Sequence, residues 1–133
     1  MAFESPGFTW TYPAAADYSA EANQYKFVKL NTSGEAEICS ATTDEAFGIL
    51  QNRPNPAVGQ LAEVMHLGIS KVRGDAALTV GANVGTSADG QAAIYVHGTD
   101  TTKYIVGKVI GACGAAGELG TVLLSGLMAG RAA

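Results

Sequence analysis

Charged and chemically reactive side chains are scarce in this sequence. Only 15% of its 133 residues are charged, whereas about one quarter are charged in a typical soluble domain. The apolar fraction of 47% excludes a disordered chain, and a chain of this length can bury one core without disulfides or metals. So little charge on a small domain favours a surface that is partly covered by copies of itself or by another chain.

The distribution of charge argues against nucleic acid and membranes as partners. The formal net charge is −4, and the eight basic residues are scattered, whereas neutralising phosphates requires clusters of lysine and arginine. The weakly charged stretch 109–130 contains Glu118 and several glycines, which oppose insertion into a bilayer. The first ten residues show no basic segment followed by an apolar one, so we expect a cytoplasmic product without a secretory signal.

The residue patterns that catalysis or metal binding requires do not occur. His66 and His97 are the only histidines, and neither has a second ligand residue at metal-binding spacing, so each is interpreted as a histidine at a strand end or on the surface. Phosphate-binding loops, dinucleotide fingerprints and the nucleophile elbow are missing. Cys39 and Cys113 are far apart and are expected to be buried thiols rather than a disulfide. We predict no enzyme activity, no cofactor, no metal and no small-molecule substrate.

From residue 25 onward, short β-prone runs alternate with turn sequences. The runs 25–30 and 35–38 flank Asn-Thr-Ser-Gly, and the runs 84–86 and 92–96 flank Asp89-Gly90, so each pair predicts a hairpin. Further strand candidates are 61–72, which Gly68 interrupts, 103–110 and 121–124. Thr42 and Glu45 have capping-box spacing and predict one helical turn. The pattern indicates an all-β fold, a small sandwich or barrel of short antiparallel strands.

The stretch GACGAAGELG, residues 111–120, has glycine at every third position. No lysine follows it and no helix pattern comes next, so a phosphate cradle is excluded, and the stretch is too short and proline-free for collagen. Glycine permits positive φ, and the flanking β-prone runs need a connection, so we predict a hairpin bend here. The small side chains of Ala115 and Ala116 suggest a sheet end that another chain can approach closely, as around a symmetry axis.

The N-terminal segment differs from the rest of the chain. We predict an extended N-terminal arm over residues 1–24 and a compact β-domain over residues 25–133. Phe8, Trp10 and Tyr12 have spacing two, so an extended backbone would present the three rings on one face, and Pro13 would end the run. Two interpretations remain open: the rings belong to the protein's own core as its first strand, or they form a partner-binding arm that docks on a neighbouring surface.

Several short phrases of the sequence resemble a known family. AFGIL, HLGISKV, ALTVGANV, ADGQA and YIVGKVIGACGAAGELGTVLLS are similar to phrases of the decoration, or cement, proteins of tailed-bacteriophage capsids. The resemblance implies a structural viral protein, commonly trimeric, that binds the outer surface of the expanded head and stabilises contacts between major capsid subunits. It also implies synthesis in the host bacterial cytoplasm and a final location on the capsid exterior of the virion.

Two other classes of function remain as alternatives. A small β-barrel enzyme or ligand carrier would use a pocket lined by Tyr95, His97 and Tyr104, with saturable ligand binding and dependence on the titration of the histidine. A surface adhesion module would instead bind sugars.

Overall fold

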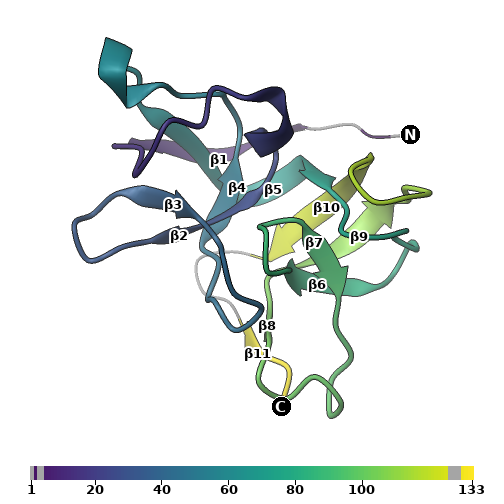
Figure 1. The fold of residues 1–133 in the computed structure, drawn as a ribbon. Helices are drawn as coiled ribbons and strands as arrows, with labels where there is room; N and C mark the ends of the chain where they lie inside the picture. Colours follow the sequence, from purple (N-terminus) through teal and green to yellow (C-terminus); the bar gives the residue numbers. More distant parts are fainter. Residues whose placement is uncertain (1, 3–4, 126–129) are drawn as a thin grey trace.

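The computed structural model describes residues 2, 5–125 and 130–133, and its strands form one curled antiparallel sheet with a small second sheet beside it (Figure 1). The described residues form eleven strands and two short 3₁₀ helices, η1 (Glu21–Asn23) and η2 (Pro56–Val58). The strands are β1 (Ser5–Tyr12), β2 (Phe27–Leu30), β3 (Ala36–Ile38), β4 (Gly48–Leu50), β5 (Ala62–Arg73), β6 (Asn83–Thr86), β7 (Ala92–Ile94), β8 (Tyr104–Ile105), β9 (Gly107–Gly111), β10 (Leu119–Ser125) and β11 (Gly130–Arg131). The predicted all-β fold is therefore confirmed.

The large sheet is organised around its longest strand, β5. Its strand order is β3-β2-β4-β5-β10-β9-β6-β7, and β1 pairs with β5 outside this path. Met65 and Val64 of β5 pair with both β4 and β1, while residues 67–73 pair with β10. Each residue of a strand can pair with one strand on each side. β1 therefore lies along one edge of β5, and β4 and β10 both lie along the other edge, β4 beside its first half and β10 beside its second half.

Successive residues of β2 and β4 belong to two different hydrophobic clusters. Phe27 and Ile49 lie in the main core inside the curl, whereas their neighbours Val28 and Leu50 lie in a second cluster on the other face. Tyr12 and Tyr18 pack against this second cluster. This part of the sheet is thus buried on both faces, which explains why β4 (Gly48–Leu50) is apolar throughout.

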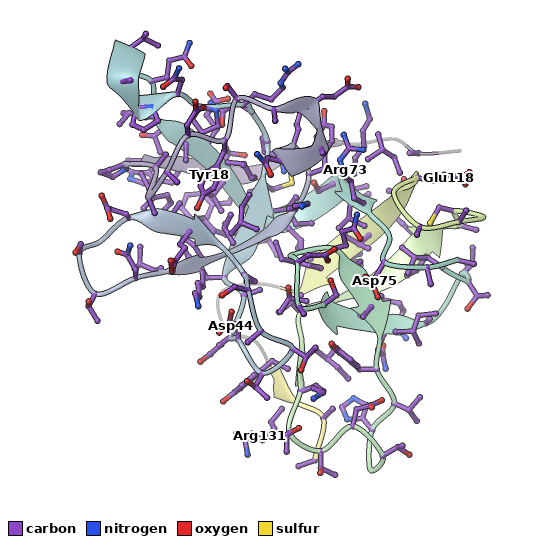
Figure 2. All side chains as sticks on the ribbon, in the orientation of Figure 1. Tyr18, Asp44, Arg73, Asp75, Glu118 and Arg131 are labelled. Carbon is purple, nitrogen blue, oxygen red and sulfur yellow. The ribbon has the colours of Figure 1, made fainter. Side chains whose placement is uncertain are left out.

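The segment between β1 and β2 is held on the sheet by polar contacts. The guanidinium of Arg73, at the end of β5, donates hydrogen bonds to the carbonyls of Glu21, Gln24 and Gly117 at 2.8 to 3.2 Å (Figure 2). It therefore ties η1 and the turn before β10 to the central strand. The division of the chain at residue 24 into an arm and a domain stays a prediction.

The predicted hairpins are present. β2 pairs with β3, and β6 pairs with β7 around Gly90, which has φ of 83°. The glycine stretch 111–120 also forms the predicted bend, because β9 and β10 pair on either side of it and Gly117 has φ of 82°. The idea that its alanines face a symmetry axis stays a prediction.

The predicted helical turn at Thr42–Glu45 is wrong, because Asp44 is used differently. Its carboxylate accepts the backbone N–H groups of Ser40 and Ala41 at 2.9 and 3.0 Å and the ammonium of Lys29 at 3.0 Å (Figure 2). These bonds stabilise a turn in place of a helix. Among the residues that the structure describes, no helix is long and apolar enough to cross a membrane.

The two cysteines, Cys39 and Cys113, are buried and free, so the expectation of thiols rather than a disulfide is confirmed. Cys39 is 1% exposed in the main core, and burial raises the pKa of its thiol to about 12. A thiol in this state is a packing group, since the reactive thiolate is strongly disfavoured.

Candidate functional site

Among the side chains that the structure describes, the most exposed aromatic ones lie on β1, which is an edge strand. Within the described residues β5 is its sheet partner, and its other edge has no paired strand. Trp10 is 61% exposed and Phe8 is 47% exposed, whereas Tyr12 is partly buried. The predicted extended run ending before Pro13 is present. The binding of a partner by the three rings stays a prediction.

The end of β1 is fixed by a buried histidine. Nε2 of His66 lies 2.7 Å from the hydroxyl oxygen of Tyr12, and Nδ1 lies 2.7 Å from the carbonyl oxygen of Phe47. A carbonyl can only accept, so Nδ1 donates to it, and in the corresponding neutral tautomer Nε2 accepts from the Tyr12 hydroxyl. The expectation that His66 lies at a strand end or on the surface is wrong, because it is 7% exposed and lies within β5.

Three aromatic rings pack around this histidine. The ring centroids of Phe8, Tyr12 and Phe47 lie 5.6, 5.5 and 4.9 Å from that of His66. Edge-to-face and tilted packing at these separations stabilises aromatic pairs by about 0.5–1.5 kcal/mol each. Phe8 and Tyr12 are therefore partly engaged within the chain, and Trp10 is the ring with most free surface.

Exposed apolar side chains continue from β1 across its neighbours. Leu67 lies opposite Phe8 in the register, and Leu123 of β10 lies opposite Ile69 of β5. Leu67 and Leu123 are each about half exposed. We call Phe8, Trp10, Leu67 and Leu123 the apolar strip. Side chains of this kind in a row over three adjacent strands are typical of a docking surface.

A hollow of about 450 Å³ adjoins the apolar strip. It shares Leu67 and Leu123 with the strip, and its remaining lining is mostly apolar. The lining residues are Leu67, Asn83, Ile105, Gly107, Lys108, Leu123 and Leu124. It extends the area that a partner surface can bury.

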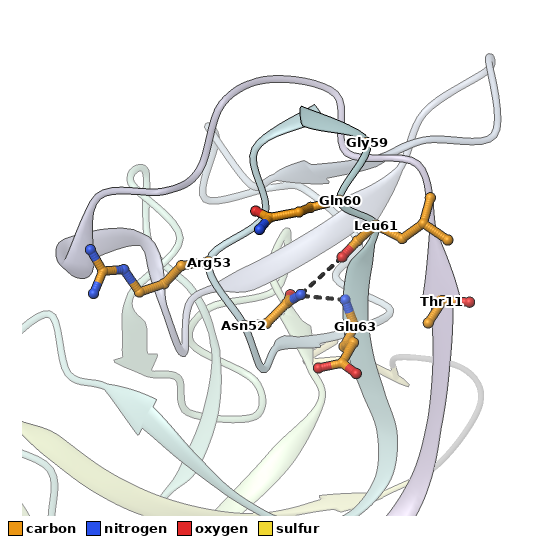
Figure 3. Close-up of a pocket in the computed structure, with 7 residues that line it drawn as sticks. All are labelled: Thr11, Asn52, Arg53, Gly59, Gln60, Leu61 and Glu63. Atoms are coloured by element: carbon orange, nitrogen blue, oxygen red, sulfur yellow. Dashed lines mark hydrogen bonds between the residues drawn. The ribbon is translucent and has the colours of Figure 1, made fainter. Parts of the chain in front are cut away.

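A more polar groove of about 580 Å³ lies beside Thr11 of β1 (Figure 3). Its lining residues are Thr11, Asn52, Arg53, Gly59, Gln60, Leu61 and Glu63. The Asn52 amide donates to the Leu61 carbonyl at 2.9 Å and accepts the Glu63 N–H at 3.0 Å, so its polar atoms are occupied by the chain itself (Figure 3). The Arg53 guanidinium donates to the Ser19 carbonyl at 2.7 Å. Asn52 and Arg53 therefore hold neighbouring segments of the chain together.

The residues of the alternative ligand pocket are largely engaged elsewhere. Tyr95 is buried and its hydroxyl donates to the Thr86 carbonyl at 2.6 Å. The Tyr104 ring lies under the Arg131 guanidinium at 5.4 Å, and His97 is exposed. Within the described ranges, no group of three or more His, Cys, Asp or Glu side chains is arranged to hold a metal ion.

The sequence analysis did not predict that His66 is buried or that Leu67 and Leu123 are exposed. The regular alternation of a strand predicts which face each side chain lies on only if no bulge interrupts it. The register between β1 and β5 shifts on both sides of Phe8, and Gly68 has φ of 121°. The glycine within the run 61–72 was the available sign of this irregularity.

These features define an all-β domain with a curled sheet and an apolar, uncharged edge. Neither a protein-family profile nor a curated protein matches the sequence. Among solved structures, the fold is similar to that of the head fiber gp8.5 N base of bacteriophage phi29, with a TM-score of 0.61 and 20% sequence identity. The match covers 89% of this chain and 93% of that one. At this identity the likeness establishes a shared fold.

Proposed function

We propose that this chain is a structural protein of a tailed-bacteriophage head, attached to the outside of the capsid. The observation that carries the proposal is the shared fold with a head fiber base over nearly the full length of both chains. The phrases that resemble capsid decoration proteins, found independently in the sequence, favour the same location. In this role the protein performs no bond-breaking step.

The finer form of the proposal is a decoration protein that stabilises contacts between major capsid subunits. The apolar strip supports it, because an exposed row of Phe8, Trp10, Leu67 and Leu123 is suited to covering apolar area on a neighbour. Burial of apolar surface contributes about 25 cal/mol per Å² before the entropy of association is subtracted. A homotrimer, which we also propose, would multiply a modest contact through avidity.

The experiment uses heads of the phage whose genome carries this gene, prepared without the protein. Purified protein is mixed with expanded heads and cosedimented. The test variant is Phe8→Ser with Trp10→Ser, because deletion of β1 would also uncover the edge of β5. The control is Val80→Ser, since Val80 is 66% exposed and lies outside the strip.

The wild type and Val80→Ser are expected to saturate the heads, and the double variant is expected to bind at least tenfold more weakly while remaining folded. Absence of wild-type binding would contradict head attachment. Unchanged binding by the double variant would contradict the role of Phe8 and Trp10, but it would not contradict head attachment.

A further inference from the structure

The direction of the backbone groups on β1 follows from the pairing of Glu63. The Gln51 N–H donates to the Glu63 carbonyl at 2.7 Å, and the Glu63 N–H donates to the Asn52 side chain at 3.0 Å. Both backbone groups of Glu63 therefore point toward the β4 side of β5. Thr11 lies directly opposite Glu63 on the other side, so the two form a non-hydrogen-bonded pair.

It follows that Thr11 directs its N–H and C=O away from β5. Thr9 lies opposite Met65, two residues along β5 from Glu63, and has the same orientation. Trp10 and Tyr12 direct their backbone groups toward β5. The outer edge of β1 thus presents the N–H and C=O groups of Thr9 and Thr11, both on exposed residues.

The other two ends of the sheet are covered by the chain itself. At β3, the outward N–H of Ala36 donates to the Pro13 carbonyl at 2.8 Å, and that of Ile38 donates to the Tyr18 hydroxyl at 3.2 Å. At β7, the Ala92 carbonyl accepts the Asp75 N–H at 2.8 Å. β1 differs from both, since no described segment pairs with its outer edge.

The side chains of β1 also lack the usual protection of an edge strand. Natural edges are blocked by charged residues, above all lysine, or by proline within the strand. From Gly7 to Tyr12 there is no charge and no proline, and Pro6 stands only near the beginning of the strand. The register shifts of β1 end at Phe8, and the regular, open and uncharged edge of residues 9–12 favours pairing with another strand.

We propose that the outer edge of β1 accepts an extended strand of the capsid shell protein, which joins the sheet through Thr9 and Thr11. The inference rests on the proposed function and identifies the contact that it uses. On the side of Phe8 and Trp10, the incoming strand carries apolar residues. On the side of Thr9 and Thr11 it carries hydroxyl or basic residues, because the exposed Glu63 carboxylate has no ion-pair partner within the described part of the chain.

Hydrogen–deuterium exchange resolved by residue tests the geometry. In the free protein, the amides of Thr9 and Thr11 exchange rapidly, and those of Trp10 and Tyr12 exchange slowly. Labelling is then repeated on protein bound to heads, with release and quenching before detection. The Thr9 and Thr11 amides are expected to become at least tenfold slower. Rapid exchange of both amides in the bound state would overturn the proposal.

Substitution provides an independent test. Thr9→Pro and Thr11→Pro each remove an outward N–H without removing a bond to β5, and proline is tolerated at such edge positions. The controls Thr9→Val and Thr11→Val keep the N–H and the branched shape. We expect each proline variant to bind heads at least tenfold more weakly, and the valine variants to bind as the wild type does. Folding is checked by the unfolding midpoint and by fluorescence of Trp10, the single tryptophan.

The outcomes separate this inference from the function on which it rests. If the wild type binds and folded proline variants bind equally well, the strand pairing is wrong and head attachment stands. If the wild type does not bind, the proposed function itself fails. If the proline variants change the oligomer mass of the free protein, a second copy occupies the edge and the shell strand is excluded.

Glu63→Lys is expected to weaken binding severalfold, and Glu63→Gln to have a smaller effect.

Discussion

The hydroxyl of Tyr12 lies 2.7 Å from Nε2 of His66, and this bond joins the end of the edge strand β1 to the middle of the sheet. His66 is held from its other side by the Phe47 carbonyl. The exposed rings of β1 are thus presented on a strand whose C-terminal end is fixed. Such a strand binds a partner without the full entropy cost of ordering a free arm.

Replacing Tyr12 with Phe is expected to destabilise the protein by about 1 kcal/mol, because the ring packing remains while buried Nε2 of His66 loses its donor. Urea unfolding measures the change. Thr11→Val serves as the control, since Thr11 is an exposed neighbour on the same strand, and it is expected to leave the free energy of unfolding unchanged. Equal stability of Tyr12→Phe and the wild type would show that the bond does not anchor β1.

Replacing Gly68 with Ala is expected to loosen β1. Gly68 has φ of 121°, and an added Cβ would lie 2.9 Å from Cα of Gly7 on β1. Gly81→Ala is the matched control, because Gly81 has φ of 90° but open space where its Cβ would be. Both variants carry the cost of positive φ, about 1 kcal/mol, and only Gly68→Ala should also accelerate amide exchange at Trp10 and Tyr12. Equal exchange in the two variants would contradict the close approach.

Stability is expected to fall as the pH rises above about 9, because of Cys39. Burial raises the pKa of the folded thiol to about 12 from an ordinary value of 9.0. Above pH 9 the folded state therefore keeps a proton that the unfolded state releases. The thiol's contribution to the free energy of unfolding is fully present below pH 9, and the free energy of unfolding decreases by up to about 1.4 kcal/mol per pH unit above it. Burial also raises the pKa of Tyr12, Tyr18 and Tyr95 above 10.0, so the thiol contributes first as the pH rises, and comparison with a Cys39 variant separates its contribution from that of the tyrosines.

Urea unfolding at pH 8, 9 and 10 tests this dependence. Cys39→Ala is expected to be less stable than the wild type at pH 8 and to lose less stability between pH 8 and pH 10 than the wild type does. A wild-type protein whose unfolding midpoint is the same at pH 8 and pH 10 would show that the thiol is not buried.

The Asp44 turn is expected to fail in acid. Burial raises the pKa of this carboxyl, but hydrogen bonds from the Ser40 N–H, the Lys29 ammonium and the Ala41 N–H outweigh it and hold the pKa below its ordinary value. Its contribution is therefore present above the unfolded pKa and is lost as the pH falls through the folded value. By thermal unfolding, Asp44→Asn should cost about 1 kcal/mol at pH 7, and the cost should decrease as the pH falls below the ordinary pKa of an aspartate. A cost that is the same at pH 7 and below that pKa would rule out the charge as its source.

Much of the fold was predictable because local chemistry determines it. The turn residues around Gly34, Gly90 and Gly117 specify three hairpins, and in the structure each of these glycines has positive φ. The predicted helical turn at Asp44 failed for a non-local reason: the ammonium of Lys29, on strand β2, binds the Asp44 carboxylate and helps to stabilise a different turn. The distant partner is what the sequence does not reveal.

The candidate site was predictable only in part. Spacing two identified Phe8, Trp10 and Tyr12 as one extended set, but not that Tyr12 is bound to His66 or that β1 pairs with its own β5. The bulge explains the omission of the leucines. Met65 and Val72 are an odd number of residues apart and yet both lie in the main core, so simple alternation along β5 assigns the wrong faces.

Electron cryo-microscopy of heads reconstituted with the purified protein tests the central claim most directly. The account predicts density for this domain on the outer capsid surface, with β1 facing the shell and a shell strand beside Thr9 and Thr11. Heads that stay bare, or a bound domain whose β1 faces solvent, would contradict it.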